Sequence, residues 1–132
     1  MKAIIPLLLA LFVSVDISPA ETGERLSESG FYAIRVQTDP PRPVVGNNTV
    51  LMTVLDRRTG KGVEGAVIEA TPWMTLHSHG STKSTRVIEQ GKGMYRVTDV
   101  YLTMEGEWDL LLSIRKDGKE DTAVFPLNKA TH

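Results

Sequence analysis

Two histidines and a methionine lie close together in one short segment of the chain. The segment reads ATPWMTLHSHGS over residues 70–81 and contains Met74, His77 and His79. In an extended stretch, side chains two residues apart point to the same side, so the two imidazoles would face one way. A thioether with two imidazoles is a soft to borderline ligand set that suits copper(I) and needs no thiol. We therefore identify residues 72–80 as a candidate metal-binding loop with these three ligands.

Two further residues bear on this candidate site. Met104 lies in the loop TMEGE, and it becomes a fourth ligand if the fold brings that loop to the same end of the domain. The ring of Trp73 would cover a bound cation as a neighbour of the ligands. Because imidazole must be neutral to bind a metal, we expect affinity to fall at acid pH. The alternative interpretation is an ordinary solvated loop, with Trp73 and Met74 capping the core.

The segments on either side of this patch alternate between apolar and polar residues, which is the pattern of half-buried strands. Turn signals separate them, including a tight connection over residues 90–93 and an Asp-Gly hairpin over residues 116–119. No segment after residue 20 keeps a helical stripe for ten residues. We predict an all-β, immunoglobulin-like antiparallel β-sandwich over residues 31–128. The seven expected strands are residues 31–37, 49–55, 66–71, 82–89, 94–100, 108–115 and 122–127.

The core of this sandwich must be stable without disulfides, because the chain contains no cysteine. The same absence excludes thiol catalysis, thiolate metal sites and a lipid attached to cysteine. We expect Met94 to face inward, because it falls in a strand pattern. The other residues expected inside are Ile34, Val50, Met52, Val54, Val67, Tyr95, Val97, Trp108, Leu110, Leu112, Ile114 and Phe125.

The first twenty residues read as an export signal. Lys2 precedes an apolar stretch over residues 3–15, and small residues stand at Ser18 and Ala20 before the expected cleavage point. The apolar stretch is too short to span a bilayer comfortably. We predict cleavage after Ala20, a location in the periplasm or outside the cell, and no membrane anchor after cleavage. The polar residues 21–30 are expected to form a flexible leader.

The composition narrows the functional classes. With 15 basic and 16 acidic side chains, the chain has a formal charge of -1 and no electrostatic attraction for nucleic acid or an anionic membrane. There is no nucleophile elbow, P-loop or dinucleotide fingerprint, so we do not expect an enzyme. The alternative to metal binding is a protein-interaction module that serves an envelope or transport complex, since sandwich edges pair readily with other strands.

Three short motifs stand in the candidate site and in the strands beside it. They are PWMTLHSHG over residues 72–80, Gly93-Met94-Tyr95, and MEGEWDL over residues 104–110. Together they resemble the YtkA-like family, which is itself similar to the periplasmic part of FixH-like proteins. The family pattern is a proline followed by Met-Pro-x-Met-Gly-His-Gly, then Gly-x-Tyr, then Met-x-Gly-x-Trp-x-Leu.

The match to the first of these motifs is partial. Met74, His79 and Gly80 agree with the family pattern, whereas Thr75, His77 and Ser78 replace a proline, a methionine and a glycine. The replacement by histidine keeps a ligand at that position, though a harder one. The resemblance covers residues 31–127 and implies an immunoglobulin-like sandwich with a link to copper handling.

Overall fold

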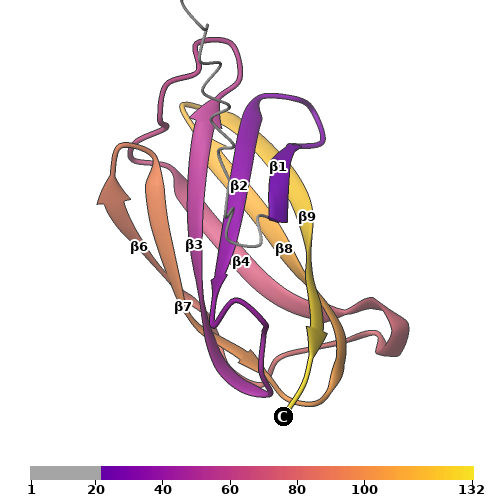
Figure 1. Ribbon diagram of the computed structural model, residues 1–132. Coiled ribbons are helices and arrows are strands. Elements are labelled where there is room, and N and C mark those ends of the chain that lie inside the picture. Colours follow the sequence, from indigo (N-terminus) through magenta and orange to yellow (C-terminus); the bar gives the residue numbers. More distant parts are fainter. Residues whose placement is uncertain (1–21) are drawn as a thin grey trace, which may run out of the picture.

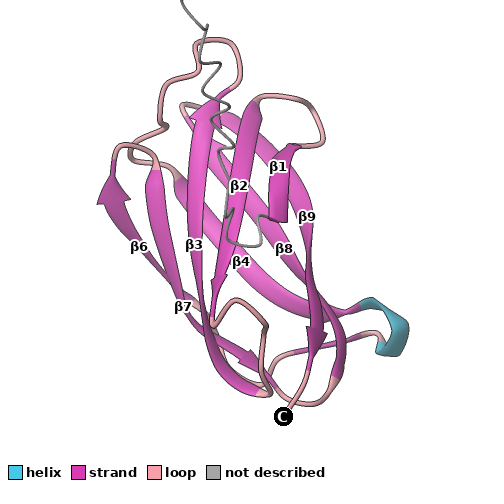
Figure 2. Ribbon diagram, in the orientation of Figure 1, coloured by secondary structure: helices cyan, strands magenta, loops and turns pink. Residues whose placement is uncertain are grey.

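The computed structural model describes residues 22–132, so the predicted export signal over residues 1–20 lies outside the described part. The described chain consists of strands joined by turns and loops, with one turn of 3-10 helix (Figure 2). No helix among residues 22–132 is long and apolar enough to cross a membrane. The elements are β1 (Thr22–Leu26), β2 (Tyr32–Asp39), β3 (Gly46–Asp56), β4 (Val67–Met74), η1 (Thr75–His77), β5 (His79–Gly80), β6 (Arg86–Gly91), β7 (Met94–Leu102), β8 (Gly106–Lys116) and β9 (Lys119–Ala130).

The strands form two sheets that pack face to face (Figure 1). One sheet has the order β1-β2-β3-β7-β6 and the other has the order β5-β4-β8-β9. Neighbouring strands pair antiparallel in both sheets. The predicted immunoglobulin-like sandwich is therefore confirmed, with nine strands over residues 22–132 instead of about seven. The two strands without a predicted counterpart are the short edge strands β1 and β5.

The core between the sheets follows the predicted alternation, with two exceptions. Val67 is 53% exposed, and its neighbour Ile68 is buried in its place. The reason is the register of β4, in which Ile68, Ala70 and Met74 face inward. Met94 is 45% exposed, so the prediction that it faces the core was wrong. The other residues expected inside are buried.

The predicted flexible leader was wrong, because β1 forms the edge of the larger sheet. Leu26 pairs with Ala33 and Arg25 pairs with Ile34 on β2. The turn after β1 is fixed by Asp121 of β9, whose carboxylate accepts a hydrogen bond of 2.6 Å from the buried Ser27 hydroxyl. Backbone pairing and this polar contact hold β1 in place. The strand therefore forms without the apolar alternation that marks the other strands.

The connections between strands gather at two ends of the sandwich. The β3–β4 connection and the β8–β9 turn lie together at the upper end in Figure 1, and η1 and the last residue of the chain lie towards the lower end. In the β8–β9 turn, Asp117 and Gly118 both have positive φ, of 51° and 76°. Two such residues match the twist of a tight hairpin, so the predicted Asp-Gly hairpin is confirmed.

Candidate metal centre

Strand β4 runs further than the sequence predicts and takes up part of the candidate site. It continues through Pro72, which is opposite Leu110 on β8, and ends at Met74. A proline is tolerated there because its nitrogen faces the side of β4 that has no pairing partner. The prediction of an exposed loop over residues 72–80 was therefore wrong for Met74, which lies in a strand and is only 1% exposed.

The chain reverses direction after β4 in a tight hairpin that contains the two histidines. After η1, Ser78 adopts a left-handed conformation with φ of 50°, and β5 then pairs with the end of β4. Met74 is directly opposite His79 in this pairing, so the two side chains share the inner face of the sheet. The hydroxyl of Thr75 donates a hydrogen bond of 2.9 Å to Asp109, which fixes η1 against β8.

The two imidazoles lie near each other at the end of this hairpin. Their ring centroids are 6.1 Å apart, with His77 exposed and His79 half-buried. The Nδ1 atom of His79 is 3.1 Å from the carbonyl oxygen of Gly80. Because a carbonyl oxygen only accepts, this hydrogen bond needs the proton on Nδ1, and neutral His79 then keeps a lone pair on Nε2. An imidazole fixed through one nitrogen in this way presents the other to a metal ion.

The aromatic neighbour of the histidines is Trp108. The sequence predicts this residue in the core and gives it no role at the site. Its ring meets the ring of His79 edge-on, with centroids 5.8 Å apart. Trp73 was expected to cover the metal, but it pairs with Gly80 and therefore lies on the opposite face of the sheet from His79. The contact between His79 and Trp108 depends on how β5, β4 and β8 are paired, which the local sequence does not reveal.

The loop that contains Met104 lies at the same end of the sandwich as the hairpin. The indole Nε1 of Trp108 donates a hydrogen bond of 3.0 Å to the backbone oxygen of Met104. A Cβ atom on Gly106 would be 2.7 Å from the terminal methyl of Met74, so this loop also borders the buried thioether. The Met104 side chain itself is 41% exposed. The four predicted ligands are thus at one end of the domain, in environments that range from core to surface.

The chemistry of this end depends on its thioethers. Among residues 22–132 there is no group of three or more histidine, cysteine, aspartate and glutamate side chains that could hold a metal ion. Two imidazoles supply two donors, so a three- or four-coordinate ion at this site needs further donors, and the thioethers of Met74 and Met104 are the soft donors at this end. Such a set is selective for a soft ion.

The fold and the site together define a small all-β domain of the immunoglobulin-like sandwich class. Residues 27–113 match the YtkA-like family, and the chain belongs to that family. A crystal structure of a DUF4426 family protein from Pseudomonas aeruginosa PAO1 is similar, with a TM-score of 0.58, 12% sequence identity, and coverage of 82% of this chain and 97% of that one. At that identity the similarity concerns the fold alone. No protein of curated function matches the chain.

Proposed function

We propose that this chain is an exported domain, periplasmic or secreted, that binds copper(I) and buffers or delivers it. The ligands in this proposal are Met74, His77 and His79, with Met104 as the fourth. The domain performs no reaction of its own. All four ligands are neutral when they bind, so they hold the ion less tightly than thiolates would and can release it to another protein.

One observation carries this proposal: a thioether and an imidazole lie opposite each other on paired strands, with a second imidazole beside them. Met74 pairs with His79, and the ring of His77 is 6.1 Å from the ring of His79. The hydrogen bond from Nδ1 of His79 to Gly80 favours a free Nε2. These contacts lie within one hairpin, so little chain has to be ordered when the ion binds.

The buried position of Met74 gives the proposal a specific structural consequence. Its side chain points into the core beside Gly106, whereas the two histidines lie nearer the surface. Methionine is unbranched and has three rotatable bonds, so its sulfur can turn from the core toward His79. We expect copper(I) to draw the Met74 thioether toward the hairpin and to change the surroundings of Trp108.

A thermal melt of the purified protein with and without copper(I) tests this function. A ligand at one hundred times its dissociation constant adds about 2.7 kcal/mol to the free energy of unfolding. For a domain of this size, that corresponds to a rise of roughly 10 °C in Tm. The His77→Ala/His79→Ala variant should lose the rise. The His132→Ala variant is the matched control, because it removes a histidine that contacts Glu105 and should keep the rise.

Two outcomes would contradict the proposal. One is the absence of any shift in the parent protein. The other is an equal shift in the His77→Ala/His79→Ala variant, which would remove this hairpin as the site.

A second candidate function, a protein-interaction module, is favoured by the open edge of β4. Strand β5 pairs with only the last two residues of β4, and a groove of about 820 Å³ runs along the rest of that edge. Residues 68–73, 80–85 and 87 line it. An exposed edge of this kind can accept an extended segment of another protein. A protein partner retained by the His77→Ala/His79→Ala variant and lost on Val87→Lys would favour this function over copper binding.

A further inference from the structure

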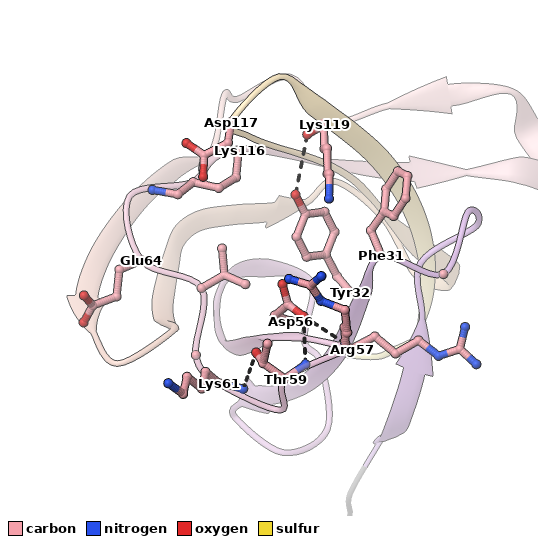
Figure 3. A pocket seen from close by; sticks show the side chains of 14 residues that line it. Phe31, Tyr32, Asp56, Arg57, Thr59, Lys61, Glu64, Lys116, Asp117 and Lys119 are labelled. Carbon is pink, nitrogen blue, oxygen red and sulfur yellow. Dashed lines mark hydrogen bonds between the residues drawn. The ribbon is translucent and has the colours of Figure 1, made fainter.

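A separate pocket lies at the opposite end of the sandwich from the histidines. Its volume is about 770 Å³, and its lining comes from three connections: residues 30–32 after β1, residues 56–59 and 61–64 after β3, and the turn between β8 and β9 (Figure 3). None of these residues belongs to the proposed copper site. The pocket therefore requires an explanation of its own.

The walls of this pocket are held in shape by hydrogen bonds within and between the connections. The backbone nitrogen of Asp56 donates to the carbonyl of Lys61 at 2.8 Å, and that of Gly60 donates to the carbonyl of Asp56 at 2.7 Å. The nitrogen of Arg57 donates to the carbonyl of Phe31 at 3.1 Å, which joins two of the three connections. A cavity that is already formed loses little conformational entropy when a ligand binds.

Five cationic side chains line the pocket. Among residues 22–132, none of these five side chains makes a salt bridge or a hydrogen bond to another residue. The ammonium group of Lys119 instead lies 5.5 Å from the centre of the Phe31 ring. In Figure 3 this group points down beside Tyr32, toward the middle of the pocket. The five are Arg57, Arg58, Lys61, Lys116 and Lys119.

Three carboxylates also line the pocket, those of Asp56, Glu64 and Asp117, and backbone N–H groups donate to the first two. Asp56 accepts hydrogen bonds of 2.8 and 3.0 Å from the nitrogens of Arg58 and Thr59. Glu64 accepts a hydrogen bond of 3.0 Å from the nitrogen of Lys92, and its carboxylate points away from Lys119 in Figure 3. The lining therefore has five cationic and three anionic side chains, and this excess of positive charge favours a negative ligand.

We propose that this pocket binds a phosphate-type oxyanion that carries two or more negative charges. Lys119 holds the anion beside Tyr32, and the arginines of the β3–β4 connection supply further donors, whereas Lys61 adds positive charge to the lining. Guanidinium and ammonium groups form strong, charge-assisted hydrogen bonds with phosphate oxygens. The ring of Phe31 shields one side of the site from water. This inference is independent of the copper site.

Calorimetric titration of the purified protein with inorganic pyrophosphate, at constant ionic strength, tests the proposal. We expect saturable binding of one anion, with changes in amide chemical shift confined to residues 30–32, 56–64 and 116–119. Lys61→Gln/Lys119→Gln should weaken binding by about tenfold or more, since a charge-assisted hydrogen bond from Lys119 and the positive charge of Lys61 are lost. The matched control is Arg42→Gln/Lys129→Gln, which removes the same charge outside the pocket and should leave the affinity unchanged.

A second arm identifies the source of the phosphate group. Vesicles of phosphatidylcholine with and without phosphatidylglycerol are tested for co-flotation with the parent protein and with both variants. Binding to the anionic vesicles alone, lost in Lys61→Gln/Lys119→Gln, assigns the site to a lipid headgroup. Binding of pyrophosphate alone assigns it to a soluble anion.

Two outcomes would overturn the proposal. One is no saturable binding in either arm. The other is equal weakening in the pocket variant and the control variant, which would show only a general effect of net charge.

Discussion

The Asp121 carboxylate should be a main determinant of stability, because it joins the first strand to the last. It accepts hydrogen bonds from the Ser27 hydroxyl at 2.6 Å, the Ser29 nitrogen at 2.9 Å and the Phe31 nitrogen at 3.3 Å. The nitrogen of Thr122 adds another at 2.9 Å. Asp121→Asn keeps the shape of the side chain. It also replaces one acceptor oxygen with an amide group that donates, in a site where every partner is itself a donor.

The expected cost follows from these contacts. Asp121 and Ser27 are both buried, so a donor left without an acceptor cannot recover its hydrogen bond from water. A buried polar group without a partner costs about 1–3 kcal/mol, and a hydrogen bond to a charged group is roughly twice as strong as a neutral one. We expect Asp121→Asn to lower the free energy of unfolding by about 3 kcal/mol, a large part of the 5–15 kcal/mol typical of a domain.

The same contacts predict how this difference depends on pH. Burial alone would raise the pKa of Asp121, but the hydrogen bonds from Ser27 and Ser29 hold the pKa below its usual value. A carboxyl group whose pKa is lowered by folding stabilises the protein above the unfolded-state pKa, which is about 3.9 for aspartate. This stabilisation is lost as the pH falls through the folded-state pKa. The difference in the free energy of unfolding between the parent and Asp121→Asn should therefore shrink below about pH 4.

Urea denaturation of the parent and the variant at pH 7, and at steps down to about pH 3, measures both effects. Asp117→Asn is the control, because Asp117 is an exposed turn residue and asparagine also tolerates its positive φ of 51°. That variant should unfold at nearly the same urea concentration as the parent. Equal midpoints for the parent and Asp121→Asn at pH 7, or a difference that does not shrink in acid, would refute the role given to this carboxylate.

Two further substitutions and one mass measurement have expected outcomes. Trp108→Ala should cost about 3–5 kcal/mol of unfolding free energy in a urea titration, because it empties a large fully buried site; a cost under 1 kcal/mol would contradict the packing. Gly93→Ala should lower Tm clearly more than Gly60→Ala: both have positive φ, of 80° and 73°, but only at Gly93 would the new Cβ meet backbone atoms, at 2.6 Å. The intact mass of protein from an export-competent host should fit a chain that begins at Glu21, and retention of Lys2 would disprove export by cleavage.

The fold was largely predictable because most strands alternate clearly between apolar and polar residues. Residues 31–37 and 94–100 follow this pattern and form most of β2 and β7. Strand β1 has no such pattern, since backbone pairing and Asp121 hold it. In β4 the adjacent apolar residues Val67 and Ile68 leave the register ambiguous from sequence, and only packing against the other sheet decides which one is buried.

The candidate site was less predictable, because it depends on contacts between distant segments. The sequence identifies the two histidines, but not the turn that brings them together: His77 ends η1 and Ser78 has a positive φ of 50°, whereas an extended stretch was expected. The burial of Met74 could not be predicted, since Pro72 indicates a loop. In the structure this proline lies within strand β4. The contact between His79 and Trp108 joins residues that are paired only through the sheet order β5-β4-β8.

X-ray absorption at the copper edge tests the central claim most directly, because it identifies the atoms bound to the metal. The proposal predicts that copper(I) added to the purified protein has both nitrogen and sulfur neighbours. The sulfur signal should be lost in Met74→Leu/Met104→Leu, and the nitrogen signal should be lost in His77→Ala/His79→Ala. Copper bound with no sulfur neighbour, or with sulfur that remains in Met74→Leu/Met104→Leu, would contradict the account.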